Sequence, residues 1–418
     1  FSFYTAAFAL SYYLLQSRIQ LDYLIYISFA FKAVFLFSIP ELSQDFYRFI
    51  WDGMLTANGY NPYLHLPSEL INDASIDLEK LGPLLYDKMG ALSNSNYTTY
   101  PPLAQLIYSL SYAIGGDSLL LNIIVLRLFN IAAEVGITVV GLRLLKRLQL
   151  PKQRILYFIM NPLVILESTF SLHFEVIMLF FICLSLIYIY KTKIYKSALS
   201  LSGAVISKLI PLMFVPLILT YLNSEKNTNR IQTKSFFKFI RFCVILILSI
   251  ILAYSFLWDN DLWLKSSNTL SLYFSSFEFN ASLYYVLRWI GYEWVGYNTI
   301  GILGKALALG TLGFILYLTF RHKKINLPTL INHMLWTSTV YYLLATTVHP
   351  WYLMLPLLLS IFTTYNYMLI WSFAVILSYS AYTHPAFQEN YGLIFIEYAL
   401  VYASLGYAFL KTKILRRN

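Results

Sequence analysis

The segment "SQDFYRFIWDGMLTANGYNPY", residues 43–63, carries two acids and a base at a spacing that suits chemistry. Asp45, Arg48 and Asp52 stand at i, i+3 and i+7, so a helix presents them on one face. The intervening apolar residues predict a short amphipathic helix at a membrane interface, ending near Asn58. A carboxylate can take a proton and a guanidinium can bind an anion. On this segment alone, a stabilising ion ladder is the simpler interpretation.

Three later stretches, "NPLVILESTFSLHFEVI", "SKLIP" and "HPWYL", place polar side chains at membrane depth or at its rim. Ionisable groups inside a membrane are costly, so each is a candidate for function. His173 and Glu175 are equally compatible with plain rim residues, and Trp351 with an interfacial aromatic belt. Lys208 can snorkel or pair with Glu167 without a catalytic role. The candidates are Glu167, His173 and Glu175 at one turn, Lys208 at a hinge, and His349 and Trp351 at another turn.

The composition predicts an all-α polytopic membrane protein. The chain has 418 residues, of which 58% are hydrophobic and only 12% are charged. A soluble α/β enzyme would carry about twice this charge, and a membrane β-barrel would show short alternating segments. Its net charge of +10 does not indicate nucleic acid, because the basic residues lie in short clusters between apolar runs. No HExxH, CxxC or EF-hand pattern is present, so no cofactor is expected to be required, and a divalent metal ion is possible but not indicated.

The basic clusters set the predicted topology, since such clusters mark cytoplasmic loops. They occur at residues 18, 143–154, 191–196, 226–241, 321–324 and 411–417. The acid-rich stretches 41–117 and 259–293 are then on the outer face. The predicted topology has about thirteen membrane segments in a single domain, 1–418. It includes a long first outer loop, 40–118, with interfacial helices, and a second outer loop, 258–300.

Residues 196–222 are predicted to enter the membrane and return, because basic clusters flank both of their ends. Each arm has a length of about 20 Å, too short for a hydrocarbon core near 30 Å. Such re-entrant helices are tolerated where they line a cavity or pack against protein. The hinge is expected between Ser207 and Pro211, which places Lys208 within the membrane.

An ordered set of motifs gives the chain a family resemblance. "DFYRFIWDG", "GYNPY", "YPPLAQ", "NPLVILE", "SKLIPLMFVP" and "HPWYL" follow one another between Ser43 and Tyr352. Together they resemble the multi-span bacterial mannosyltransferases of the GT-C superfamily. A more distant likeness runs to the eukaryotic glycosylphosphatidylinositol mannosyltransferase I. The expected fold is therefore a GT-C-like helical bundle.

The resemblance implies a polyprenyl-phosphate sugar as donor and a lipid or glycan as acceptor. It also implies inversion at the anomeric carbon, an active site on the periplasmic or outer side of a bacterial inner membrane, and contact with membrane lipids. The catalytic acidic residue of the first outer loop corresponds to Asp45. The eukaryotic relatives have two acids two residues apart, whereas Ser43 takes that place here, so a metal-binding aspartate pair is not expected.

The chemistry of inverting transfer assigns the remaining roles. One base must take a proton from the acceptor hydroxyl, and cations must stabilise the departing lipid phosphate. Arg48 suits the phosphate through its bidentate fork, with Lys208 and His349 as further candidates. The residues expected to bind sugar or acceptor are Asp52, Asn61, Tyr63, Tyr100, Glu167, His173, Glu175 and Trp351.

The sequence thus favours a hexosyltransferase, and mannose is the sugar that the resemblance implies. Two other classes remain open: a flippase or transporter of lipid-linked oligosaccharides, and an O-antigen ligase or polymerase that uses a diphosphate-linked glycan. The candidate residues gather on one side of the membrane and no internal repeat is visible, which disfavours a transporter. A purely structural membrane subunit would not need acids and cations on one outer face.

Overall fold

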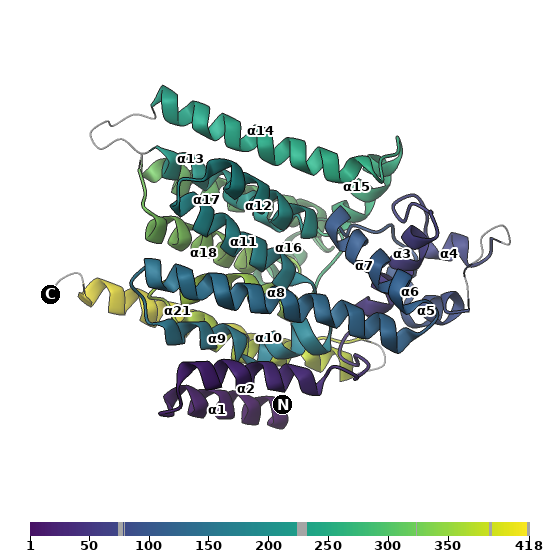
Figure 1. Ribbon diagram of the computed structural model, residues 1–418, viewed down its shortest axis with the longest axis horizontal. Coiled ribbons are helices and arrows are strands. Elements are labelled where there is room, and N and C mark those ends of the chain that lie inside the picture. Colours follow the sequence, from purple (N-terminus) through teal and green to yellow (C-terminus); the bar gives the residue numbers. More distant parts are fainter. Residues whose placement is uncertain (74–77, 79, 224–231, 323, 384–386, 416–418) are drawn as a thin grey trace.

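The computed structural model shows a bundle of long helices that run side by side, with short helices gathered at one end (Figure 1). The structure describes residues 1–73, 78, 80–223, 232–322, 324–383 and 387–415. Residues 74–77 and 79 of the predicted first outer loop, and 226–231 of one basic cluster, lie outside the described residues.

The described chain begins with two short helices, and residues 40–118, the predicted first outer loop, hold α3 to α7. The elements of this half are α1 (Ser2–Gln16), α2 (Leu21–Val34), α3 (Asp45–Ala57), α4 (Pro67–Leu70), α5 (Gly82–Lys88), α6 (Ala91–Asn94), α7 (Pro102–Gly115), α8 (Leu119–Arg147), η1 (Lys152–Ile155), α9 (Leu156–Ile159), α10 (Pro162–Val164), η2 (Ile165–Phe170), α11 (Glu175–Tyr190), α12 (Ile194–Ser207), η3 (Ile210–Phe214) and α13 (Val215–Leu222).

The second half contains three long helices and a second group of short ones. Its elements are α14 (Thr233–Ser255), α15 (Leu262–Leu272), α16 (Leu283–Val295), α17 (Ile300–Arg321), α18 (Leu327–Leu344), η4 (Pro350–Leu353), α19 (Met354–Ile361), α20 (Tyr367–Ala374), η5 (Val375–Thr383) and α21 (Tyr391–Leu415). All described elements are helical, in agreement with the predicted all-α class.

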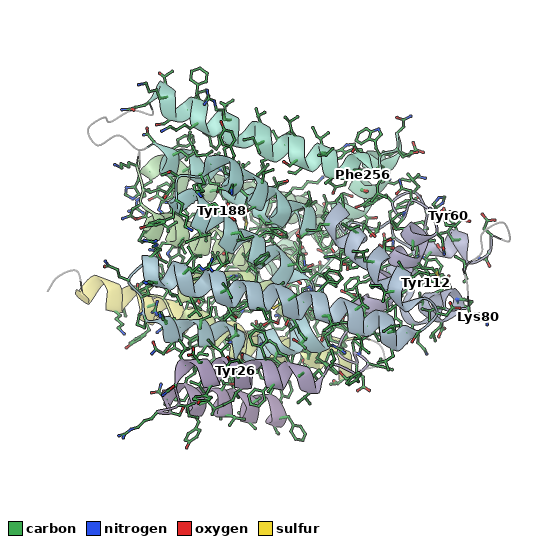
Figure 2. All side chains as sticks on the ribbon, in the orientation of Figure 1. Tyr26, Tyr60, Lys80, Tyr112, Tyr188 and Phe256 are labelled. Atoms are coloured by element: carbon green, nitrogen blue, oxygen red, sulfur yellow. The ribbon has the colours of Figure 1, made fainter. Side chains whose placement is uncertain are left out.

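The two ends of the bundle differ in charge. At one end Arg147, closing α8, lies 5.7 Å from the ring of Tyr190 at the end of α11, beside the basic residues 191–196. At the other end the two outer loops meet, where the Nζ atom of Lys265 donates to the carbonyl of Leu64 at 2.9 Å. Figure 2 marks the two ends, with Tyr188 toward one of them and Tyr60, Lys80 and Tyr112 toward the other.

Four described helices are long and apolar enough to cross a membrane: α8, α14, α17 and α21. A fifth span is possible if α10–η2 and α11 together form one broken crossing, bent by 114°. By length and composition the structure therefore supports four or five spans and not the thirteen predicted. The other apolar segments are too short or are divided. For example, α2 has 14 residues, which spans only about 21 Å at 1.5 Å per residue.

The predicted hinge coincides with a break in the structure. Helix α12 ends at Ser207, and Lys208 has extended backbone angles, φ −161° and ψ 133°. A tight helical turn, η3, follows and begins with Ile210 and Pro211. The chain then returns through α13 toward the end where α14 begins (Figure 1). Lys208 consequently sits at the tip of this helical hairpin.

Helix α8 crosses the centre of the bundle and carries charged side chains into it. Glu134 and Lys32 of α2 are both fully buried, and Lys32 Nζ lies 3.1 Å from Glu134 Oε2. Lys32 also donates to the carbonyl of Ile159 at 2.6 Å, and Ser168 donates to Glu134 Oε1 at 2.6 Å. A buried ion pair of this kind is tolerated because each charge has further hydrogen-bond partners.

We predict that Glu134→Ala strongly destabilises the protein. The substitution leaves the buried Lys32 ammonium without its counter-charge, which typically costs about 3–5 kcal/mol. The melting temperature of purified protein in detergent should fall accordingly. Asp87→Ala is the matched control, because Asp87 forms a largely exposed pair with Lys88 and such pairs contribute about 0–1 kcal/mol. Equal melting temperatures for the two variants would contradict this view of the core.

Candidate active site

The site is built around a break in the chain between α10 and α11. Residues 165–170 form a π-helical turn, and Leu172 adopts φ 65°, a left-handed conformation that is unfavourable for a leucine. Such irregular backbone frees carbonyl groups that need donors inside a membrane. Turns of this type are frequent at functional sites, where local strain is retained by the surrounding structure.

Side chains of α8 supply the donors. Arg127 Nε donates to the carbonyl of Thr169 at 2.6 Å, and Asn130 Nδ2 donates to the carbonyls of Ser168 at 2.7 Å and His173 at 3.2 Å. The other Arg127 nitrogens donate to two carbonyls at the end of α2. These contacts hold the broken segment in place and fix where Glu167, His173 and Glu175 point.

Helix α3 brings Asp45 to this break. The helix is buried inside the protein, whereas the sequence predicted a helix at the membrane interface. Phe46, Ile50 and Trp51 of α3 are fully buried, and the helix packs against α5 and α7. Its contact with α7 requires Gly53, since a Cβ atom there would lie 2.2 Å from the carbonyl oxygen of Tyr108. The helix ends at Ala57 and the next glycine has φ 82°, close to the predicted end.

Asp45, His173 and Glu167 form a series of polar groups. Asp45 Oδ2 lies 4.0 Å from His173 Nδ1, and Glu167 Oε2 lies 3.5 Å from His173 Nε2. Tyr379 of η5 donates to Glu167 Oε1 at 2.6 Å. Side chains from three elements that are distant in the sequence thus lie close together. Asp45 is the member of this series that stands at one end, facing the cavity.

Lys208 enters the same region from the hairpin tip. Its ammonium pairs with Glu175, which is buried at the start of α11. It also lies 4.9 Å from the ring centroid of Tyr352, close enough for a cation–π contact. The pairing partner is therefore Glu175 rather than Glu167, the alternative considered from the sequence. About 31% of the Lys208 side chain remains exposed, so the cation stays accessible.

Aromatic rings from the second half of the chain cover these groups. The ring of His173 stacks on Trp351 at 3.6 Å, and Trp351 stacks on His349 at 4.4 Å. Phe279 of the second outer loop stacks on His349 at 4.7 Å. The backbone of Phe279 pairs with residues 346–348, which anchors this loop beside the stack.

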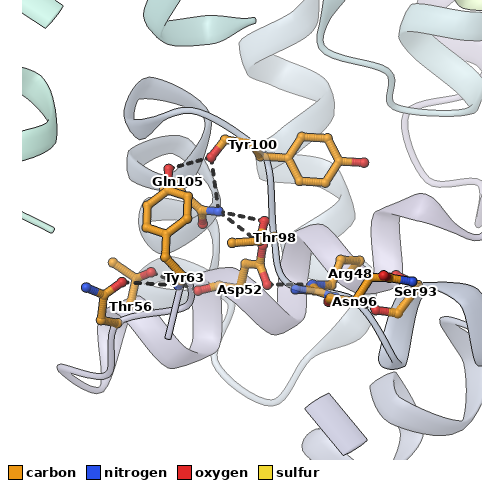
Figure 3. A network of polar contacts seen from close by, with 10 residues as sticks. Arg48, Asp52, Thr56, Tyr63, Ser93, Asn96, Thr98, Tyr100 and Gln105 are labelled. Carbon is orange, nitrogen blue, oxygen red and sulfur yellow. Dashed lines mark hydrogen bonds and ion pairs between the residues drawn. The ribbon is translucent and has the colours of Figure 1, made fainter. Parts of the chain in front are cut away.

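Asp52 and Arg48 form a buried network that supports the first outer loop (Figure 3). Arg48 Nε lies 2.7 Å from Asp52 Oδ1, and Gln105 Nε2 donates to Asp52 Oδ2 at 3.1 Å. Arg48 Nη1 also donates to the carbonyls of Ser93 and Asn96. Arg48 therefore pairs with Asp52 alone, and Asp45 is left to face His173.

Asn61 and Tyr63 hold the loop from its other side. Asn61 Nδ2 donates to the carbonyl of Leu257 at 2.7 Å, which ties the first outer loop to the end of α14. The hydroxyl of Tyr63 donates to the carbonyl of Tyr100 at 2.5 Å. Burial, with the charge of Asp52 nearby, raises the pKa of Tyr63 well above its usual range, so this hydroxyl keeps its proton.

These groups surround a cavity of about 2150 Å³, well above the roughly 300–1,000 Å³ of a common small-molecule site. Eight of the residues selected from the sequence line it, and four do not. The lining residues are Asp45, Arg48, Tyr100, His173, Glu175, Lys208, His349 and Trp351. The other four are Asp52, Asn61, Tyr63 and Glu167, which contact the lining residues or the loop that carries them.

The environment of Asp45 changes its acidity. Its side chain is 35% exposed, and that exposure faces the cavity. Desolvation raises the pKa of Asp45 from 3.8 to about 6, although the charge of Lys208 lowers it in part. A carboxylate with a pKa near 6 is a better base than an ordinary aspartate and is still ionised at neutral pH.

The sequence reasoning missed the residues that position the site. Lys32, Arg127 and Glu134 are ionisable residues within predicted spans, and the rule that singled out Lys208 applies to them as well. Arg127, Asn130 and Glu134 also follow the i, i+3, i+7 spacing of a helix face. Tyr379 gave no such signal, because tyrosine is common throughout this chain. Within the described part of the chain, no three His, Cys, Asp or Glu side chains gather as a metal site.

Comparison with known families decides the class of the protein. Residues 3–224 match the model of the MptA_B family, described as the N-terminal domain of alpha-(1->6)-mannopyranosyltransferases. The chain belongs to the MptA_B family. This family is one of mannosyltransferases, which agrees with the resemblance seen in the motifs. No curated protein and no solved structure matches the chain.

The match to the MptA_B family divides the site into two parts. The matched half supplies Asp45, the α8 donors, the broken segment and Lys208. His349, Trp351 and Tyr379 come from the half of the chain that follows residue 224. The cavity therefore lies between a family-defining half and a second half that covers it with aromatic rings.

We predict that Asp45→Asn raises the melting temperature at pH 8. The folded protein holds Asp45 with a pKa of about 6, above its ordinary 3.8. Ionised Asp45 therefore lowers stability above pH 6, and this penalty disappears as the pH falls below about 4. The gain should shrink when the melt is repeated at pH 4.5.

Asp52→Asn provides the contrast, because it removes the buried partner of Arg48 and should destabilise the protein at pH 8. If Asp45→Asn lowers the melting temperature at pH 8 as much as Asp52→Asn does, the described environment of Asp45 is incorrect.

Proposed function

We propose that this protein is an inverting mannosyltransferase that moves mannose from a polyprenyl phosphate to a lipid or glycan hydroxyl at the outer face of a membrane. The observation that carries the proposal is the meeting of a base and a cation in one cavity. Asp45 and Lys208 both line it, at the end of the bundle opposite the basic segments, and the chain belongs to a mannosyltransferase family.

Asp45 acts as the base in this proposal. The acceptor oxygen forms a bond to the anomeric carbon, its proton passes to the Asp45 carboxylate, and the bond between that carbon and the phosphate oxygen breaks. The electron pair leaves with the polyprenyl phosphate, and no co-reactant is needed. The imidazole of His173 lies between the carboxylates of Asp45 and Glu167, at 4.0 Å and 3.5 Å, distances longer than those of good hydrogen bonds. An alpha-linked product then requires a β-linked donor, because a single displacement inverts the anomeric carbon.

Lys208 is the proposed partner of the donor phosphate. The leaving phosphate gains negative charge as the bond breaks, and a fixed cation in a desolvated site stabilises that charge. Lys208 is preferred over Arg48, because about 31% of its side chain is exposed, against 5% for that of Arg48. His349 lies farther along the aromatic stack and lines the same cavity.

The location follows from charge. The basic segments are expected to face the cytoplasm, which puts the cavity on the outer side, or the periplasmic side if the membrane is a bacterial inner membrane. Membrane lipids would surround the apolar helices α8, α14, α17 and α21. The proposal includes no metal ion, and incubation with EDTA should leave turnover unchanged.

We predict that Asp45→Asn lowers kcat by at least about 100-fold, the usual range for loss of a general base. Purified protein in nanodiscs is given polyprenyl-phosphate-[³H]mannose together with a native membrane extract, and label in the extracted products is counted. Asp87→Asn, the same substitution at a largely exposed position that does not line the cavity, is the control and should retain most activity. Near-normal turnover by Asp45→Asn would exclude Asp45 as the base.

A second prediction concerns pH. The base is active when deprotonated, so kcat should rise with pH, reach half of its maximum near pH 6 and stay level above pH 7. An ordinary aspartate would put this midpoint near pH 4. A profile that is flat from pH 4.5 to 8 would contradict the role of Asp45 in the chemical step.

We further predict that Lys208→Gln raises KM for the donor and lowers kcat, whereas KM for the acceptor changes little. Loss of one fixed cation or donor at a developing charge typically costs about 10²–10³ in kcat. Lys265→Gln is the control, since Lys265 donates to the carbonyl of Leu64 and does not line the cavity. A defect confined to acceptor KM would remove Lys208 from the phosphate site.

A further inference from the structure

Helix α21, a candidate membrane span, carries a single acidic residue, Glu397. This residue lies about 9 Å along the helix from Tyr391, at 1.5 Å per residue, and its side chain is fully buried. Glu397 Oε1 accepts from Asn280 Nδ2 at 3.2 Å and from Trp371 Nε1 at 3.1 Å. The other carboxyl oxygen, Oε2, has no hydrogen-bond partner among the described residues. One oxygen of this carboxyl group therefore has two donors and the other has none.

The surroundings of Glu397 hold no balancing cation. Among the described residues, no lysine, arginine or histidine forms an ion pair with it. Arg288 of the second outer loop pairs instead with Glu278, and its Nη2 atom donates to the hydroxyl of Tyr391 at 3.2 Å. A fully buried carboxylate without a counter-charge is so costly that such a group keeps its proton. Glu397 is therefore expected as the neutral acid, with one O–H to donate.

Asn280 of the second outer loop offers the matching acceptor. Its side chain is fully buried, and its Oδ1 atom, like Glu397 Oε2, has no hydrogen-bond partner among the described residues. Its backbone N–H donates to Glu389 Oε1 at 2.6 Å, and its carbonyl accepts from the hydroxyl of Tyr398 at 2.6 Å. Two acceptor oxygens cannot bond to each other, but a protonated Oε2 can donate to Oδ1. An acid and an amide paired in this way share two hydrogen bonds.

The position of Asn280 matters because the residue before it reaches the cavity. The N–H of Phe279 donates to the carbonyl of Thr346 at 3.1 Å, and its carbonyl accepts from the N–H of Val348 at 2.8 Å. The ring of Phe279 stacks on His349 at 4.7 Å, and both residues line the cavity. Asn280 itself has φ 45°, a left-handed conformation that persists only where the surrounding structure determines it.

We propose that Glu397 is held as a neutral carboxylic acid whose Oε2–H donates to Asn280 Oδ1, and that this acid–amide pair fixes the second outer loop on α21. Neither residue lines the cavity, so both are positioning residues that act through Phe279 on His349. Their effect on transfer rests on the proposed function, in which His349 is a further candidate for the donor phosphate. The proton on Glu397 does not depend on that function.

Infrared difference spectroscopy reads this proton without turnover. The spectrum of wild-type protein minus that of Glu397→Gln, both in nanodiscs at pH 7.5, should contain the carbonyl band of a protonated carboxylic acid. Asn280→Leu should move this band to higher frequency, because the carbonyl loses a hydrogen bond from the amide. The bands of an ionised carboxylate in place of the acid band would overturn the proposal, and an acid band that Asn280→Leu leaves in place would remove Asn280 as the partner.

Transfer from the labelled donor tests the positioning role. Glu397→Gln replaces the O–H donor by an amide N–H, and kcat and the donor KM should stay near their wild-type values. Glu397→Leu has no polar atom to offer, and it should raise the donor KM and lower kcat by up to about 100-fold, the effect of misplacing a group that binds substrate. Equal losses for the two variants would show that the negative charge is needed, and would contradict the proposal.

Glu293→Leu is the matched control, because it is the same substitution at an exposed position of the second outer loop that does not line the cavity. It should leave kcat and the donor KM unchanged. A comparable loss in this control would show that a leucine anywhere in the loop is harmful, and would remove the support that Glu397→Leu gives.

A double-mutant cycle tests whether Glu397 acts through Phe279. Phe279→Ala takes the ring away from His349 and should itself lower kcat. The double variant with Glu397→Leu should then lose little more than the larger of the two single losses. Losses that multiply in full would contradict an action through Phe279. If wild-type protein transfers no mannose to any acceptor in a native membrane extract, the proposed function is refuted, whereas the infrared bands still decide whether the acid–amide pair exists.

Discussion

The structure depends on hydrogen bonds that α8 donates to irregular backbone within the bundle. A π-helical turn and a left-handed Leu172 free several carbonyl groups between α10 and α11, and such groups cannot be left unpaired away from water. Arg127 and Asn130 satisfy them from one face of α8. These bonds offset the cost of the break at which His173 and Glu175 turn toward Asp45 and Lys208.

That fixed break explains how residues from distant parts of the chain meet. Glu175 places the Lys208 ammonium, and His173 faces Asp45 on one side and stacks with Trp351 on the other. Asp45 lies at the edge of this group of contacts, and the exposed part of its side chain faces the cavity. The division agrees with the family match, since the first half holds the charged groups and the second half supplies the aromatic cover.

Much of the site was predictable from residue types, and much of the fold was not. The cost of burying a charge selected Lys208 and Glu175, whereas helix-face spacing and the family resemblance selected Asp45. The predicted number of membrane spans was wrong, because apolar composition does not reveal whether a segment is one long helix or several short pieces such as α9, α10 and η2. Asp52 shares a helix face with Asp45, but its pairing with Gln105 depends on α7, which no local pattern encodes.

The most direct test is a structure of the protein with a non-transferable polyprenyl phosphonate that carries mannose. The account predicts the phosphonate oxygens beside Lys208 and the anomeric carbon turned toward the Asp45 carboxylate. A headgroup bound away from this cavity, or with the anomeric carbon turned from Asp45 while the phosphonate contacts neither Lys208 nor His349, would contradict it.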